Sequence, residues 1–206
     1  MGTRVFRGDL PASIANEFSS VDRIAWDTET SGLDWRSDSL GLCQVHAPGV
    51  GTALVQITDE LPGRLIDLLT SPRVTKVLHH APFDLRFMRR AWGVRANNIR
   101  CTKVASKLVW PEAPSRDHSL GALVSRRLGV VLDKGAVRVS DWRAVDLSEA
   151  QISYASRDVE FLLPLLDDLT GLIAERDVRQ LYEECCWFLP TQVEVAIAGV
   201  DDVFAY

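Results

Sequence analysis

Two acidic residues, Asp27 and Glu29, lie two positions apart in a segment that begins with apolar residues and then alternates. In a β-strand, residues two positions apart point to the same face, so the two carboxylates would lie side by side. Neighbouring carboxylates repel each other, and burying them without a partner costs several kcal/mol. Their hard oxygen atoms suit Mg²⁺ or Mn²⁺, which makes the pair a candidate metal site. The alternative is a polar strand end that enters a turn.

Tyr154 and Asp158 form a second pair, four positions apart in the C-terminal third of the chain. The preceding pattern Ser148-x-x-Gln151 is a capping box and predicts that a helix begins there. Residues four positions apart stack on one face of a helix. Because apolar residues share that face, we expect it to point inward, where an acid needs a partner such as a metal ion. The alternative is an acid at a helix edge beside a core tyrosine.

Asp84 is a third candidate, because it lies in the first turn of a helix predicted directly after a strand at residues 74–78. The helix dipole also stabilises an acid at this position. Taken alone, Asp84 is therefore explained by the helix without any role in metal binding. Three motifs in order within one chain favour shared chemistry instead. They are a strand Asp-x-Glu, then His-His-x-x-Phe-Asp, then a helical Tyr-x-x-x-Asp.

All three motifs resemble those of the DEDD exonucleases, in the subgroup whose third motif contains a tyrosine. The matching segments are residues 26–30, 79–84 and 154–158, joined by residues 119–123, 128–134 and 140–142 for the ribonuclease D branch. The chain departs from that branch at Cys101, where ribonuclease D usually has an acid. It also departs in the second motif, where His80-Ala81-Pro82 precedes the aspartate.

The resemblance implies a 3′→5′ exonuclease that hydrolyses phosphodiester bonds and releases 5′-mononucleotides. It also implies that two divalent ions, Mg²⁺ or Mn²⁺, are held by Asp27, Glu29, Asp84 and Asp158. One ion would activate water and the other would stabilise the leaving oxygen, about 3.5–4 Å away. Tyr154 would orient the attacking water, since its unperturbed pKa of about 10 makes it a poor base at neutral pH.

Within this branch, the small bacterial nanoRNase C proteins resemble the chain over nearly its whole length. This resemblance implies a preference for very short RNA, down to dinucleotides, and a ring-like homo-oligomer that we expect to be an octamer. Leu33 matches a leucine that wedges between terminal bases in related enzymes; a core leucine is the alternative. His79 matches a histidine common in the second motif. It would contact the substrate, and the alternative is a histidine at a strand end that is hydrogen-bonded to the backbone.

Three other functions stay open at this point. They are 3′ trimming of longer RNA as in ribonuclease D, exonuclease action on DNA, and nucleic-acid binding by an inactive site. The complete set of four acids and a tyrosine argues against the inactive site. Phosphodiester chemistry is common to both polymers, and recognition of the RNA 2′-hydroxyl depends on geometry that a sequence does not contain.

The elements that must position these residues alternate along the chain. Strands are predicted at residues 24–29, 42–46 and 52–57, and a turn at residues 47–51 implies antiparallel pairing. Helices and strands then alternate, which favours an α/β sheet covered by helices. These further elements are predicted at residues 62–69, 74–78, 82–91, 99–101 and 102–109.

The last third of the chain is predicted to be helical. A helix from residue 148 to about 169 contains Pro164, which should kink or split it, and Pro190 is expected to end another helix. The resemblance implies the ribonuclease H-like exonuclease fold, an α/β fold in which helices flank a mixed sheet, followed by a C-terminal helical extension. We expect one domain over residues 1–206, with its core at about 20–170 and the extension at about 171–206.

The formal net charge of −5 disfavours tight binding to long polyanions. Residues 85–111 nevertheless contain no acid and carry a set of cations that could bind phosphate. These cations are Arg86, Arg89, Arg90, Arg95, Arg100, Lys103 and Lys107. Arg89, Arg100 and Lys103 are the candidates for substrate contact, and a solvated helix face is the alternative.

The cysteines and the hydropathy pattern bear on where the protein acts. Cys43, Cys101, Cys185 and Cys186 lack the spacing of a zinc site. No stretch reaches the ~18 apolar residues that would cross a bilayer, and the N-terminus lacks the pattern of a signal peptide. We therefore expect a cytoplasmic protein with reduced cysteines, whose partner is nucleic acid and not a membrane.

Overall fold

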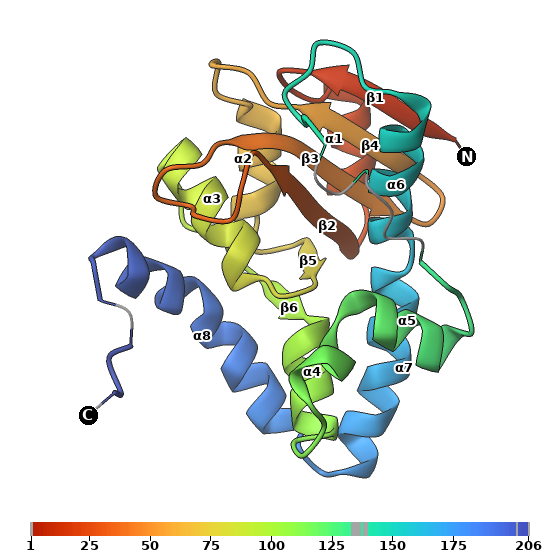
Figure 1. Cartoon of the computed structure of the whole chain (residues 1–206), viewed down its shortest axis with the longest axis vertical. Coiled ribbons are helices and arrows are strands. Elements are labelled where there is room, and N and C mark those ends of the chain that lie inside the picture. Colours follow the sequence, from red (N-terminus) through yellow and green to blue (C-terminus); the bar gives the residue numbers. More distant parts are fainter. Residues whose placement is uncertain (1, 133–136, 138–139, 201, 206) are drawn as a thin grey trace.

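A single six-stranded sheet forms the centre of the computed structural model, which describes residues 2–132, 137, 140–200 and 202–205. Asp133 and Lys134, from the ribonuclease D-like stretch, lie outside the described residues. The strand order is β1-β4-β3-β2-β5-β6 (Figure 1). The strands are β1 Thr3–Arg7, β2 Arg23–Thr30, β3 Leu40–Ala47, β4 Gly51–Gln56, β5 Thr75–Leu78 and β6 Ile99–Cys101.

Strands of both orientations build the sheet. β2, β3 and β4 form an antiparallel meander, as the turn at residues 47–51 predicted. β1 pairs in parallel with β4, and β5 pairs in parallel with both β2 and β6. The predicted mixed sheet is therefore confirmed. β1, a half-exposed edge strand, was not predicted, and it starts the sheet at Thr3, ahead of the core boundary expected near residue 20.

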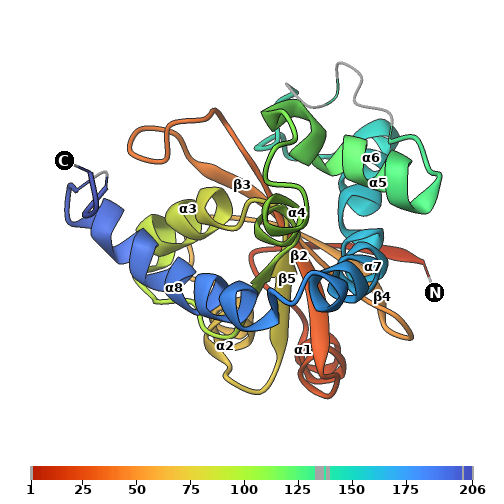
Figure 2. The ribbon, with the colours of Figure 1, turned by 90° about the horizontal axis from the view of Figure 1, so that it is seen from below.

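Helices cover both faces of this sheet, and Figure 2 shows α6 and α1 on opposite sides of the strands. α6 lies against β2, β3 and β4, where Leu42, Leu54 and Ala155 surround the buried Trp142. The larger core contains side chains from the other face of the strands and from α1, α2 and α3. The helices are α1 Ala12–Ser19, α2 Gly63–Thr70, α3 Pro82–Trp92, α4 Thr102–Val109, α5 Leu120–Leu128, α6 Glu149–Glu160, α7 Leu162–Glu175 and α8 Arg179–Ile197.

The two C-terminal prolines have different effects. The predicted long helix is split, because α6 ends at Glu160 and α7 begins at Leu162, with Pro164 in its first turn. Pro164 has no N–H for the carbonyl of Glu160, so the break falls one turn before it. The prediction for Pro190 was wrong, since α8 runs through it. Pro190 is buried on α8, which packs against α3 and β6, and this packing outweighs one lost hydrogen bond.

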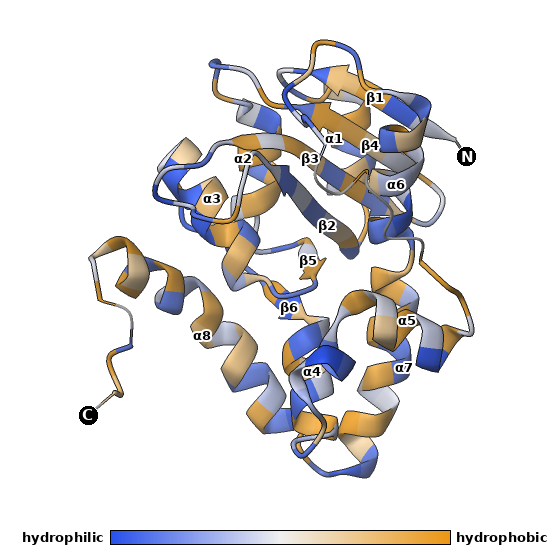
Figure 3. Cartoon of the chain, in the orientation of Figure 1, coloured by the Kyte–Doolittle hydropathy of each residue, from blue (hydrophilic) through white to orange (hydrophobic). Residues whose placement is uncertain are grey.

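α8 passes along the β6 edge of the sheet and against α3 and α4, and the tail after it turns away from this packing (Figure 1). Hydrophobic residues recur along this helix and into the tail (Figure 3). Five large ones are exposed and define what we call the α8 surface: Leu181, Trp187, Val200, Val203 and Phe204. None of the described helices combines the length and the apolar character needed to cross a membrane.

Candidate active site

The end of β2, the loop after it, the first turn of α3 and the middle of α6 surround a cavity of about 450 Å³. We call it the acidic pocket, because Asp27, Glu29, Asp84 and Asp158 all line it. Tyr154 lines it as well. The fold therefore brings together five residues that span more than half of the sequence, as the three motifs predicted.

Three of the acids converge closely. Asp27 and Glu29 are two positions apart on β2, and α6 brings Asp158 toward them. Each offers a carboxylate oxygen, and these three oxygens all lie within 4.8 Å of one another. Burial, and then the charges of Asp84, Asp158 and Glu29, raise the pKa of Asp27 well above its usual value. This oxygen-only donor set fits a divalent cation of the Mg²⁺ class, which would offset the repulsion.

Asp84 approaches the same pocket from α3. Pro82 is the first residue of this helix, so its missing N–H has no cost there and Asp84 falls in the first turn. The side chain is buried, and the Thr28 hydroxyl donates a 2.6 Å hydrogen bond to its carboxylate. Burial raises the pKa of Asp84 to about 7, even though this hydrogen bond opposes the shift.

Tyr154 is held from two sides. Its hydroxyl donates a hydrogen bond to Asp158, one turn further along α6. Its ring lies 5.9 Å, centroid to centroid, from the ring of Trp142, which is buried. Burial and the neighbouring acids, Asp158 first, raise the pKa of Tyr154 above its ordinary value. The phenol is therefore protonated at neutral pH and has no capacity to act as a base there.

A short loop at residues 31–39, which we call the Leu33 loop, forms one rim of the pocket. Leu33 lines the pocket with 84% of its surface exposed, so the alternative of a core leucine is wrong. The two ends of the loop are joined, because Ser31 N–H donates to the Ser39 carbonyl at 2.9 Å and Ser39 N–H donates to the Ser31 hydroxyl at 2.9 Å. A Cβ at Gly32 would lie 2.3 Å from the Asp38 carboxylate, so a larger residue there would have to displace that side chain.

His79 also lines the pocket, at the end of β5. Its Nδ1 forms a 2.9 Å hydrogen bond with the side-chain hydroxyl of Thr102. At this nitrogen the partner is therefore a side-chain hydroxyl and not the backbone. The next residue, His80, has a positive φ of 60° at the point where the second motif departs from the family pattern.

The three predicted phosphate contacts lie in different places. Arg89 points away from the pocket and forms an ion pair with Glu194 of α8, at 2.7 Å. Arg100 lines a separate cavity beside α8 and donates to the Ile99 carbonyl. The prediction that these two residues contact substrate is therefore corrected: within one chain, both lie beside α8 and outside the acidic pocket.

Lys103 differs from these two cations because its charge acts on a residue of the pocket. The pKa of His80 is lowered to about 4, first by desolvation and then by the positive charges of Lys103, Arg86 and Lys107. His80 itself lines the acidic pocket. We call these three cations the basic rim.

Sequence reasoning missed three residues that support the acids. Thr28 donates to Asp84, and the Gln44 amide donates to a Glu29 oxygen at 3.4 Å. Trp142 is buried, and its ring contacts that of Tyr154. Thr28 could have been found from the sequence, because a polar residue between the two acids of a buried strand needs a hydrogen-bond partner on the other face of that strand. Nothing in the sequence pairs Gln44 with Glu29, because that contact depends on strand register.

Comparison with known protein families places these residues in a wider group. Residues 4–174 match the model of a 3′-5′ exonuclease family. Ribonuclease D of Haemophilus influenzae is 28% identical, over 84% of this chain and 42% of its own length. Ribonuclease D of Escherichia coli is 33% identical, over 76% of this chain and 41% of its own length. The chain thus spans less than half of these two relatives.

Solved structures match over more of the chain. NrnC of Brucella melitensis with bound Mg²⁺ is 34% identical and covers 100% of both chains, with a TM-score of 0.89. The same protein bound to pGG is 34% identical over 100% of this chain and 99% of that one, with a TM-score of 0.90. RNase D of Escherichia coli is 25% identical over 100% of this chain and 52% of that one, with a TM-score of 0.79. The chain therefore belongs to the 3′-5′ exonuclease family, on its ribonuclease D branch and close to NrnC.

Proposed function

We propose that the chain is a metal-dependent 3′→5′ exoribonuclease that acts on very short RNA and releases 5′-mononucleotides. The observation that carries this proposal is the convergence of three carboxylates within 4.8 Å in a pocket also lined by Asp84 and Tyr154. The family match supports the reaction class. The likeness to NrnC bound to pGG supports a substrate of dinucleotide size.

The metal requirement follows from the donor set. Asp27, Glu29, Asp84 and Asp158 offer only oxygen atoms, and two of them are held where burial disfavours their charged forms. We propose that these four acids hold two Mg²⁺ or Mn²⁺ ions, in keeping with the Mg²⁺ bound by NrnC. Such ions lower the pKa of water and stabilise the charge that develops on the leaving oxygen.

Tyr154 has a positioning role in this proposal. Its hydroxyl donates to Asp158, so its oxygen lone pairs are available to accept a hydrogen bond from the attacking water. Trp142 fixes the ring, and the raised pKa keeps the proton on the phenol. The residue thus orients water without removing its proton, which agrees with the role that the family resemblance implies.

Two rims of the pocket support a short substrate. The exposed Leu33 provides an apolar edge against which a terminal base would pack. The basic rim lies at His80, on the α3 and α4 side, and would attract a 5′ phosphate. A short RNA whose 5′ phosphate reaches this rim gains charge-assisted hydrogen bonds that a continuing chain does not make. His79, also on the lining, would contact the substrate near the acids.

Assembly and location complete the proposal. We propose a homo-oligomer, with an octamer as the form implied by the resemblance, and the α8 surface as an exposed apolar region available for contact. Cys43, Cys101, Cys185 and Cys186 are free thiols, in keeping with a reducing cytoplasm.

The second candidate function is exonuclease action on longer RNA, as in ribonuclease D, or on DNA. It is favoured by the family match alone.

A substrate panel tests this function. RNA and DNA of two to twenty nucleotides, labelled at the 5′ end, would be digested with Mg²⁺, with Mn²⁺ or with EDTA. We expect mononucleotide release that needs metal and a higher kcat/KM for a 5′-phosphorylated RNA dinucleotide than for a 20-mer. Asp158→Asn should abolish cleavage with an unchanged circular dichroism spectrum. A kcat/KM that rises steadily with length would contradict the short-substrate proposal, and cleavage in EDTA would contradict the metal mechanism.

A further inference from the structure

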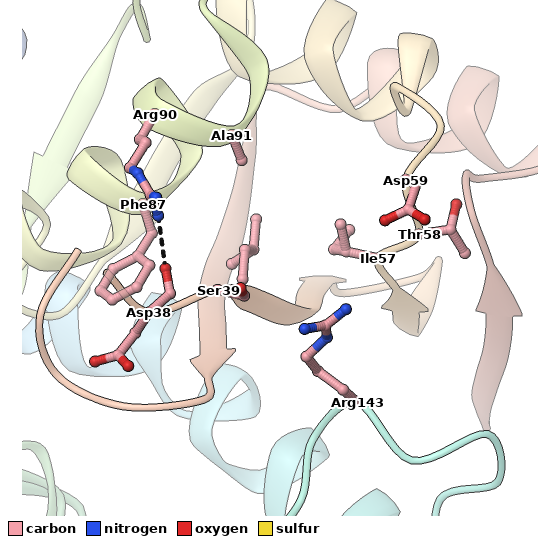
Figure 4. Close-up of a pocket in the computed structure, with 10 residues that line it drawn as sticks. Asp38, Ser39, Ile57, Thr58, Asp59, Phe87, Arg90, Ala91 and Arg143 are labelled. Atoms are coloured by element: carbon pink, nitrogen blue, oxygen red, sulfur yellow. Dashed lines mark hydrogen bonds between the residues drawn. The ribbon is translucent and has the colours of Figure 1, made fainter. Parts of the chain in front are cut away.

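A second cavity, of about 300 Å³, lies beside the Leu33 loop and shares no lining residue with the acidic pocket (Figure 4). Its walls come from α3, from the end of the Leu33 loop, from the chain after β4 and from the segment before α6. Two guanidinium groups, of Arg90 and Arg143, belong to its lining. The reaction proposed above does not use this cavity.

Arg143 is held in place by its neighbours on both sides. Trp142 is buried against Gly41, where an added Cβ would lie 3.1 Å from the Trp142 side chain and carbonyl. The Gln56 amide donates to the Ala144 carbonyl at 2.8 Å, which ties the other side to β4. The Arg143 guanidinium itself faces the opening (Figure 4) and has no hydrogen-bond or ion-pair partner among the described residues. A positioned cation with free N–H groups is the feature that an anion needs.

Arg90 lies across the opening from Arg143 (Figure 4). One of its nitrogens donates to the Asp38 carbonyl at 2.8 Å, so α3 is connected to the end of the Leu33 loop. The guanidinium has five N–H donors, and the others are available to a ligand. The Asp38 carboxylate is engaged within its own loop, where it accepts from the Asp34 N–H at 2.8 Å.

Of the other eight lining residues, four are apolar and four are polar. Leu40 and Phe87 are almost fully buried, and Ile57 is partly buried beside them. Thr58 offers a hydroxyl, and the Asp59 carboxylate lies on the same side of the opening as Ile57 (Figure 4). A simple anion would contact only Arg143. A ligand that uses the whole lining would also have an apolar part for Leu40 and Ile57 and a hydrogen-bond donor for Asp59.

We propose that this cavity binds a free nucleoside monophosphate, with its phosphate on Arg143, its ribose hydroxyls near Asp59 and its base against Leu40 and Ile57. A guanidinium forms its strongest hydrogen bonds with phosphate oxygens, and a carboxylate accepts from ribose hydroxyls. Arg90 then donates to an acceptor on the base edge, as arginine does with guanine. A volume of about 300 Å³ has room for one nucleotide, at the small end of known ligand sites.

Calorimetric titration in EDTA measures this binding without depending on catalysis. Guanosine and adenosine monophosphates would be compared with ribose 5-phosphate and inorganic phosphate. We expect the nucleotides to bind more tightly than ribose 5-phosphate, and inorganic phosphate to bind most weakly. Arg143→Gln should weaken nucleotide binding by about tenfold or more, as loss of a charged hydrogen bond does. Arg116→Gln, at an exposed arginine of the 3₁₀ helix Ser115–His118, is the matched control and should bind as the wild type does.

The same titration separates this cavity from the acidic pocket. Asp158→Asn should retain nucleotide binding, because Asp158 does not line the second cavity. Binding that is lost in Asp158→Asn and kept in Arg143→Gln would assign the nucleotide to the acidic pocket and overturn the proposal. Equal affinity for ribose 5-phosphate and the nucleotides would overturn it too, since the base would then contribute nothing. Both outcomes leave the substrate panel above unaffected.

Discussion

At the scale of single residues, the acidic pocket combines burial with negative charge. Asp84 is buried beside Thr28, and burial is the main cause that raises the pKa of both Asp84 and Asp27. Groups of this kind destabilise a fold when they ionise without a partner. A cation bound by the same acids would reverse that effect, because it favours their charged forms.

The first prediction is that the metal-free protein loses stability as the pH rises. The pKa of Asp84 is about 7 in the fold and ordinarily 3.8, so the folded chain holds more protons than the unfolded chain between these values. Its contribution to stability is therefore complete below pH ~4 and is lost as the pH rises through ~7. In EDTA, the melting temperature should fall between pH 5 and pH 8, and Mg²⁺ should raise it most at pH 8.

Asp84→Asn is the control for this prediction, because the amide does not titrate. Its melting temperature in EDTA should fall less steeply over the same pH range than that of the wild type. Parallel curves for the two proteins would show that Asp84 ionises in the fold with an ordinary pKa. Differential scanning fluorimetry at a fixed ionic strength is sufficient for the comparison.

At the scale of elements, α6 determines where Tyr154 and Asp158 lie. Its first turn is fixed by the capping box, in which the Ser148 hydroxyl accepts from the Gln151 N–H at 3.2 Å and the Gln151 side chain accepts from the Ser148 N–H at 3.0 Å. The Gln151 amide also donates to the Ser140 hydroxyl at 3.0 Å. One cap thus joins the helix that carries two pocket residues to Ser140, which lines the same pocket.

The second prediction is that Ser148→Ala lowers both stability and activity. Removing a helix N-cap costs about 1 kcal/mol, which corresponds to a fall of roughly 2–4 °C in the melting temperature of a domain of this size. We expect kcat to fall more than KM changes, because Tyr154 and Asp158 lose their fixed position. Ser125→Ala, at an exposed site inside α5, should leave both quantities unchanged. An unchanged melting temperature in Ser148→Ala would mean that the cap contributes nothing.

The sequence predicted those features that depend on local spacing. The i, i+2 acids of β2 and the capping box of α6 each follow from one periodicity, and both were found. The direction of Arg89 was not predictable, because a charge pattern does not state whether a helix face meets solvent or α8. Continuation of α8 through Pro190 depends on packing against distant elements, which a local rule does not include. The contact between Gln44 and Glu29 likewise needs the register of β3 on β2.

At the scale of the whole molecule, the α8 surface provides the third prediction. Trp187 is 79% exposed, which is costly for a side chain of this size unless another surface covers it. We expect light scattering at micromolar concentration to report an oligomer, and Trp187→Ser to shift it toward smaller species. Leu61→Ser, at an apolar residue exposed to 64% before α2, should have no such effect. A monomeric wild type would contradict the proposed assembly.

The last prediction concerns the charge balance of the molecule, whose formal net charge is −5 although a basic rim lies beside the acidic pocket. The phosphates of a short substrate contact few cations besides those of the basic rim, so few counterions are released when it binds. For single strands, each phosphate contact contributes about −0.7 to the slope of log affinity against log salt. We therefore expect log kcat/KM for a 5′-phosphorylated dinucleotide to fall with log salt at a slope between about −0.7 and −1.4. Lys103→Ala should make this slope shallower and Arg100→Ala should not, because Arg100 lies at the cavity beside α8. A steeper wild-type slope, unchanged in Lys103→Ala, would mean that the substrate contacts many phosphate sites outside the basic rim.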